Sequence, residues 1–168
     1  MPEGRDVNQL LGQMASDLRS LLASRHISDP LMIGIHTGGV WVAEVLHRQL
    51  DLAGPLGSLN ITFYRDDFTH IGMHPQVQPS ILPFEVENHH IILVDDVLHT
   101  GRTIRAALNE IFDYGRPASI ILATLVERSG RELPICADVV GTRIELLPEQ
   151  NIKLSGPDPL ILTKRGNT

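Results

Sequence analysis

The feature that most constrains the fold is an aliphatic run, residues 91–95 (IILVD), that ends in two adjacent carboxylates, Asp95 and Asp96. An apolar run without polar alternation is expected for a strand that is covered on both faces, as in a parallel sheet. Similar short apolar segments lie at 31–35, 59–64, 118–126 and 137–144, and helical spacing of apolar residues occurs at 10–22, 40–50 and 104–112. Because strands alternate with helices, the sequence predicts an α/β domain with a mostly parallel twisted sheet flanked by helices.

The chain length and composition indicate one globular domain, residues 1–168. The 42% of hydrophobic residues is typical of a globular protein, and a single cysteine, Cys136, excludes an internal disulfide framework. No apolar run approaches the roughly 18 residues that a membrane span needs. The N-terminal segment MPEGRDVNQL lacks the apolar stretch of a signal peptide. We therefore expect a cytoplasmic protein without a membrane partner.

The residues after the aliphatic run carry the chemistry of a ligand site. Thr100-Gly101-Arg102-Thr103 follows the two aspartates and opens the next helical segment. Backbone N–H groups at a helix start attract phosphate, the glycine permits close approach of the backbone, and the two threonine hydroxyls add donors. The paired carboxylates can accept hydrogen bonds from the vicinal hydroxyls of a ribose. Residues 91–103 therefore predict a site for the ribose and 5-phosphate of a phosphoribosyl compound.

Other interpretations of residues 91–103 account for only part of the segment. A Walker A loop needs GxxxxGK[ST], which the sequence lacks, and no GxGxxG precedes a helix. Adjacent acids at a strand end also occur in the Mg²⁺ sites of receiver-like domains, but those sites lack the Thr-Gly-x-Thr turn. In a purely structural interpretation, the two aspartates cap a strand and Gly101 serves only the turn. The phosphoribosyl interpretation accounts for every part of the segment.

Residues 91–103 resemble the thirteen-residue phosphoribosyl diphosphate motif of the type I phosphoribosyltransferases, which has an aliphatic run, two acids and then TGxT. Four segments resemble the members of that family that act on uracil and regulate pyrimidine genes: NITFYRDDF (60–68), VDDVLHTGRT (94–103), GRPASI (115–120) and LVERSGRELPICAD (125–138). The similarity covers most of residues 30–145. It implies the type I phosphoribosyltransferase fold, with a mobile loop and a small hood region.

The resemblance assigns a role to each matching segment. Catalysis is assigned to Asp95, Asp96 and Arg65, and the ribose and 5-phosphate of phosphoribosyl diphosphate are assigned to Asp95, Asp96, Val97, Leu98, His99, Thr100, Gly101, Arg102 and Thr103. The pyrophosphate loop is His36, Thr37, Gly38 and Gly39, the mobile loop starts with Tyr64, Arg65, Asp66 and Asp67, and the base pocket includes Arg128, Leu133, Pro134 and Ile135. Mg²⁺ is expected to bind mainly through the substrate, without a firm protein ligand.

The implied reaction joins uracil to phosphoribosyl diphosphate and releases UMP and diphosphate. His99 occupies a position that is acidic in purine-specific relatives, which favours a pyrimidine base. The pyrophosphate loop lacks the basic residue that relatives commonly carry, so stabilisation of the leaving group would rest on backbone N–H groups, His36 and the metal. We therefore expect Gly38→Arg to raise the rate. Two alternatives stay open: a nucleotide-sensing regulator with little or no catalysis, and a purine salvage phosphoribosyltransferase.

The resemblance also implies UMP-responsive regulation of pyrimidine genes through binding of their leader mRNA, and assembly into a homodimer or a higher homo-oligomer. The net charge of −6 argues against an obvious nucleic-acid binder, so RNA binding would need a basic surface made across subunits. Candidate arginines for such a surface are scattered along the chain: Arg19, Arg25, Arg116, Arg128, Arg131 and Arg143.

Overall fold

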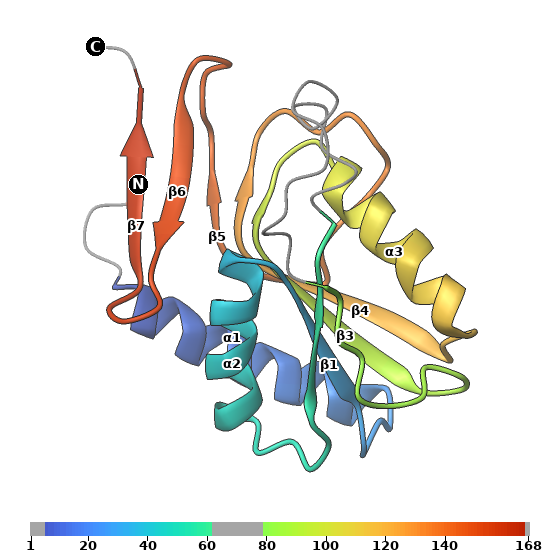
Figure 1. Cartoon of the computed structure of the whole chain (residues 1–168). Helices are drawn as coiled ribbons and strands as arrows, with labels where there is room; N and C mark the ends of the chain where they lie inside the picture. The colour runs from blue at the N-terminus through green and yellow to red at the C-terminus, as the bar shows by residue number, and fades with distance from the viewer. Residues whose placement is uncertain (1–5, 62–78, 167–168) are drawn as a thin grey trace.

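The structure, a computed structural model, describes residues 6–61 and 79–166. Five parallel strands form its main sheet in the order β2-β1-β3-β4-β5 (Figure 1). The strands are β1 (Leu31–Ile35), β2 (Leu56–Leu59), β3 (His90–Leu98), β4 (Ser119–Arg128) and β5 (Val139–Ile144). The strand order reverses between β1 and β3, and ligands of such sheets bind at this switch point, outside the carboxyl ends of the strands. The expected parallel α/β sheet is confirmed.

Helices cover both faces of this sheet, which explains why residues 91–94 of β3 are apolar without interruption. The helices are α1 (Val7–Ser24), α2 (Gly38–Gln49) and α3 (Arg102–Tyr114). The first two lie on one face of the sheet and α3 lies on the other (Figure 1). Along β3, Ile92 and Val94 pack in the core formed with α1 and α2, whereas Ile91 and Leu93 pack in the core formed with α3. Each face of the strand therefore needs its own apolar side chains.

A second, antiparallel sheet consists of two strands, β6 (Asn151–Ser155) and β7 (Ile161–Arg165). Its inward side chains, Ile152, Leu154 and Leu162, join the core that α1 and α2 share. The sequence shows only short apolar pieces here because alternate residues of the hairpin face solvent. None of the helices in the described part of the chain is long and apolar enough to cross a membrane.

One strand lies earlier in the chain than the sequence predicts. A strand is expected at 59–64, but β2 ends at Leu59, and Asn60 and Ile61 lie outside any strand. The reason is the length of its partner, because β1 has five residues and its pairing with β2 stops where Ile35 meets Leu59. Residues 62–64 lie outside the described residues. Conversely, β3 continues past the two aspartates because Val97 pairs with a residue of β4.

A close contact between a helix and a strand sets the position of α2. A Cβ atom added to Gly34 in β1 would lie 2.8 Å from Val40 Cα and 2.9 Å from Ala43 Cβ, both in α2. These separations are shorter than van der Waals contact between carbon atoms. Only a residue without a side chain lets the helix come this close to the strand. The start of α2 is therefore held directly at the carboxyl end of β1.

Candidate active site

The start of α2 forms the first part of the site. The chain passes from β1 to α2 through His36 and Thr37, whose peptide bond is cis. The His36 N–H donates to the Leu59 carbonyl at 2.8 Å, which ties this turn to the end of β2. Because Gly38 and Gly39 begin the helix, their N–H groups have no acceptor within it and are suited to contact an anion.

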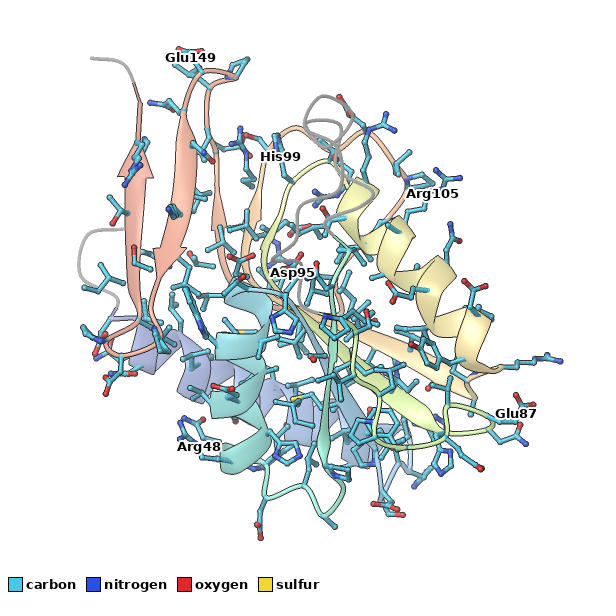
Figure 2. All side chains as sticks on the ribbon, viewed as in Figure 1. Arg48, Glu87, Asp95, His99, Arg105 and Glu149 are labelled. Carbon is cyan, nitrogen blue, oxygen red and sulfur yellow. The ribbon has the colours of Figure 1, made fainter. Side chains whose placement is uncertain are left out.

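The two aspartates near the end of β3 form the second part. Asp95 is only 5% exposed, and Asp96 is partly buried. The Asp96 N–H donates to Asp95 Oδ1 at 2.8 Å, and the Val97 N–H donates to Asp96 Oδ1 at 2.8 Å. These backbone donors hold the carboxylates in place at the switch point. Figure 2 shows Asp95 beside the start of α2, toward the same end of the sheet as His99.

Glycines bring these two parts into contact. A Cβ atom on Gly38 would lie 2.7 Å from Asp96 Cγ, and one on Gly39 would lie 2.8 Å from the Val94 carbonyl oxygen. The helix start and the acid pair therefore form one unit. This geometry argues against the expectation that Gly38→Arg raises the rate, because a side chain at that position has to displace the carboxylate of Asp96.

We predict that replacing Gly38 with alanine or arginine lowers the affinity for phosphoribosyl diphosphate about tenfold or more, because the added Cβ displaces a carboxylate assigned to the ribose. Isothermal titration calorimetry measures this affinity. Gly12→Ala is the matched control, because a Cβ at Gly12 meets nothing within 4 Å. Tighter binding or faster turnover of a Gly38 variant would contradict this account.

The turn between β3 and α3 forms the third part of the site, a pocket of about 130 Å³. Its lining residues are Val97, Leu98, His99, Thr100, Gly101, Thr103 and Ile104. Gly101 precedes α3 with a φ of 97°, the left-handed conformation that favours glycine. The pocket therefore surrounds the N-terminal end of a helix, where a phosphate is stabilised by backbone N–H groups. All of its lining residues except Ile104 are among those assigned to the ribose and phosphate.

Arg102 differs from its neighbours in this turn, which we call the phosphate turn (residues 99–103). Its side chain is not part of the pocket lining and instead pairs with Glu132, with Nε 3.0 Å from Oε2. Both side chains of this pair are more than half exposed, and such pairs contribute at most about 1 kcal/mol to stability. The Arg102 N–H donates to Thr100 Oγ1 at 3.2 Å. The backbone of Arg102 therefore takes part in shaping the turn, while its side chain leads away from the pocket.

The segment assigned to the base lies against the phosphate turn. We call residues 132–135 the base loop. The N–H groups of its first two residues both donate to the Thr100 carbonyl at 3.0 Å. A Cβ atom on Gly101 would lie 3.3 Å from Leu133 Cβ and 3.4 Å from Ile135 Cβ. Two of the four residues assigned to the base pocket therefore flank the phosphate turn directly.

The other two base-pocket residues differ in their surroundings. Pro134 lies between the two flanking residues in the base loop. Arg128, at the end of β4, is only 5% exposed, and its guanidinium donates to the Gln150 carbonyl at 2.9 Å and to the Ser129 carbonyl at 3.2 Å. These two hydrogen bonds join the end of β4 to the connection that precedes β6. They do not lead toward the base loop.

Two histidines at the site are less basic than usual. Burial lowers the pKa of His36 below its ordinary value of 6.5, although Glu44 opposes this shift. His99 is exposed, yet partial desolvation lowers its pKa, and the nearby guanidinium of Arg128 lowers it further. Both imidazoles are therefore mostly neutral at pH 7. His36 can donate a hydrogen bond to a diphosphate, but it brings no positive charge before the ligand binds.

No motif in the sequence marks Arg131 as a residue that joins two segments of the site. Its guanidinium donates from Nε to the Ile135 carbonyl at 2.9 Å, from Nη1 to the His99 carbonyl, and from Nη2 to Glu127 Oε1 at 2.6 Å. One of these partners lies 32 positions away in the chain. No local motif marks such a contact, because it exists only when β3 and β4 pair.

The mobile-loop residues Tyr64, Arg65, Asp66 and Asp67 lie outside the described residues. Among the residues that the structure does describe, no three His, Cys, Asp or Glu side chains converge as a metal site. The carboxylates of Asp95 and Asp96 are oxygen donors of the kind that Mg²⁺ prefers, and Mg²⁺ usually takes further ligands from water and substrate phosphates. The donor set therefore fits a Mg²⁺ ion held largely by the ligand.

Solved structures of purine phosphoribosyltransferases share this fold. A Trypanosoma cruzi hypoxanthine phosphoribosyltransferase superposes with a TM-score of 0.65 at 21% identity, over 83% of this chain and 74% of that one. A hypoxanthine phosphoribosyltransferase from Staphylococcus aureus superposes with a TM-score of 0.62 at 20% identity, over 81% of this chain and 74% of that one. At these identities the similarity shows the fold alone.

Sequence comparisons are more specific. Residues 6–156 match the family model described as a phosphoribosyl transferase domain. The chain is 64% identical over 161 residues to the bifunctional protein PyrR of Nitrosococcus oceani, covering 95% of this chain and 91% of that one. It is 59% identical over 157 residues to the bifunctional protein PyrR of Pseudomonas aeruginosa, covering 94% and 92%. The chain therefore belongs to the phosphoribosyltransferase family, with PyrR proteins among its relatives.

Proposed function

We propose that the chain transfers the phosphoribosyl group of phosphoribosyl diphosphate to uracil, forming UMP and diphosphate. The observation that carries this proposal is the convergence of three parts at the switch point of the sheet: the start of α2, the acid pair of β3 and the pocket at the start of α3. A diphosphate, a ribose diol and a 5-phosphate need these three environments in this order. One substrate, phosphoribosyl diphosphate, uses all of them.

The arrangement suggests how the reaction proceeds. Asp95 and Asp96 accept hydrogen bonds from the ribose hydroxyls, and the phosphate turn holds the 5-phosphate. Uracil N1 bonds to the anomeric carbon and loses its proton, while the bond from that carbon to the diphosphate oxygen breaks. Negative charge grows on the leaving group, where the N–H groups of Gly38 and Gly39 are placed to stabilise it.

Two further contributions to leaving-group stabilisation are part of the proposal. A Mg²⁺ ion held largely by the substrate, with the carboxylates of Asp95 and Asp96 as oxygen donors, would neutralise charge on the diphosphate. Arg65 of the mobile loop is assigned to the same charge by the family resemblance. We place this chemistry in the cytoplasm, where both substrates are expected to be available.

The choice of uracil rests on the base side of the site. The PyrR relatives cover nearly the whole chain, and the segment 125–138 resembles uracil-specific members of the family. His99, at the rim of the phosphate pocket, stands where purine-specific relatives carry an acidic residue, so the chain offers no carboxylate to a purine N7 at this position. Structural similarity to purine enzymes concerns the fold only and does not favour a purine here.

We predict uracil-dependent release of diphosphate from phosphoribosyl diphosphate with Mg²⁺. Asp96→Asn should lower kcat/KM for phosphoribosyl diphosphate about 100-fold, because an amide is a weaker acceptor for the ribose hydroxyls in a partly buried site. Asp17→Asn is the matched control, since Asp17 is exposed on α1 and its carboxylate accepts a hydrogen bond from the side chain of Gln13 at 2.9 Å. A coupled diphosphate assay measures the rates. Binding of UMP without any uracil-dependent release would instead support a sensor that lacks catalysis.

We predict that UMP binds at least about tenfold more tightly than GMP, because a pocket set for a pyrimidine gains little from a larger ring and has to widen to admit it. Competition against a fluorescent nucleotide gives the dissociation constants of UMP and GMP under the same conditions. Tighter binding of GMP would overturn the uracil assignment in favour of purine salvage.

We further propose UMP-responsive regulation of pyrimidine genes through their leader mRNA, because the relatives are named bifunctional. Most of the arginines considered for an RNA surface form ion pairs or hydrogen bonds within the chain. Arg25 pairs with Asp138, Arg143 pairs with Glu127, and Arg19 donates to the Gln49 carbonyl. A single protomer therefore offers few uncommitted cations among these candidates. This favours an RNA surface made by a homodimer or a higher homo-oligomer, which stays a prediction.

Gel shifts with pyrimidine leader RNA test the regulatory role. We expect UMP to increase the fraction of RNA bound and added salt to weaken binding steeply, because phosphate contacts release counterions. A scrambled RNA of equal length is the control. An RNA shift that is indifferent to UMP would remove the regulatory part of the proposal and leave the enzymatic part standing.

A further inference from the structure

Arg131 contacts three segments that have different tasks in the site. One nitrogen of its guanidinium donates to the base loop at Ile135, a second to the phosphate turn at His99, and a third to Glu127 near the end of β4. The side chain is 25% exposed, so these bonds form in a partly dehydrated environment. Hydrogen bonds from a charged donor are stronger than neutral ones, and the fork of an arginine fixes their relative directions.

Glu127 anchors this guanidinium to the sheet. Its two carboxylate oxygens are shared between two arginines, with Oε1 2.6 Å from Arg131 Nη2 and Oε2 2.8 Å from Arg143 Nε. In the sheet, Glu127 pairs with Leu98 of β3 and with Arg143 of β5. The carboxylate is mostly buried, at 17% exposure. Arg131 is therefore held from the rigid sheet and reaches outward to the two loops.

The base loop is joined to the phosphate turn at two places. At its beginning, the N–H groups of Glu132 and Leu133 donate to the Thr100 carbonyl. At its end, Arg131 binds the carbonyl of Ile135 and, at the same time, the carbonyl of His99. The first joint consists of backbone groups and survives any side-chain substitution. The second joint depends entirely on the guanidinium.

We propose that Arg131 is a positioning residue that holds the end of the base loop at a set distance from the phosphate turn, so that uracil meets the anomeric carbon of the bound ribose. This inference rests on the proposed function. Arg131 does not itself touch the reacting atoms in this account. It acts through the loop, and because reaction depends steeply on alignment, a shift of about 1 Å can cost roughly 100-fold in rate.

The test is steady-state kinetics of Arg131→Gln and Arg131→Lys with both substrates varied. For Arg131→Gln, we expect kcat/KM for uracil to fall about 10- to 100-fold, mainly through a higher KM, since charged hydrogen bonds to both loops are lost. The KM for phosphoribosyl diphosphate should stay within about threefold, because the backbone joint at Thr100 still shapes the phosphate turn. Lysine should remain impaired, since one ammonium cannot reproduce a planar fork that binds three partners.

Arg143→Gln is the matched control. It removes the other arginine from the same glutamate, but it touches neither loop, and its side chain is 71% exposed. We expect its uracil KM to stay within about twofold of the parent value. Thermal melting of all variants shows whether they fold. If Arg131→Gln does not fold, the kinetics of Arg131→Lys still test the proposal.

Each outcome separates this inference from the proposed function. A parent protein without uracil-dependent diphosphate release defeats the proposed function itself. An active parent whose Arg131 variants keep the uracil KM defeats only the positioning role. Equal rises in KM for both substrates, or full activity of Arg131→Lys, would also defeat it, because the first indicates general loss of structure and the second shows that a charge alone suffices.

Discussion

The close approach of α2 to the carboxyl ends of β1 and β3 is the constraint on which the site depends. Three glycines permit it: Gly34 lies under the helix, and Gly38 and Gly39 lie against the end of β3. Backbone N–H groups at the helix start thereby come next to two carboxylates with no side chain between them. A single substituted methyl group at these positions would separate donors that suit a diphosphate from acceptors that suit a ribose. The packing of α2 against the sheet therefore sets the spacing between the N–H donors and the carboxylates of the site.

This arrangement also addresses an electrostatic conflict. Phosphoribosyl diphosphate carries many negative charges, yet the proposed function assigns its ribose diol to two carboxylates, which repel phosphates. Among the described residues, both histidines of the site have lowered pKa values and contribute little positive charge at pH 7. The donors at the two helix starts are dipoles of the backbone, which attract anions without forming ion pairs that would neutralise the acids. In the proposed mechanism, a metal ion that binds with the substrate supplies the positive charge that offsets the negative charge of the phosphates and the two acids.

The base side of the site is organised differently from the phosphate side. In the proposed function the phosphate groups meet backbone N–H groups at helix starts, whereas the end of the base loop is held by the side chain of Arg131. Glu127 anchors Arg131 to the sheet, and Arg131 contacts both loops. The fold is shared with purine enzymes, so in the proposed function the choice of base depends on the base loop and its contacts rather than on the fold.

By itself the sequence determined the α/β class, most helices and strands, and the phosphoribosyl motif, because each depends on neighbours within a few positions, such as the apolar run before Asp95 or Gly101 before a helix. It placed one strand too late, since β2 ends where its partner β1 ends. Only the tertiary structure decided that Gly38 lies against the carboxylate of Asp96, that Arg102 points toward Glu132, and that Arg131 joins two loops. These contacts arise from packing between segments distant in the chain, and no local pattern encodes them.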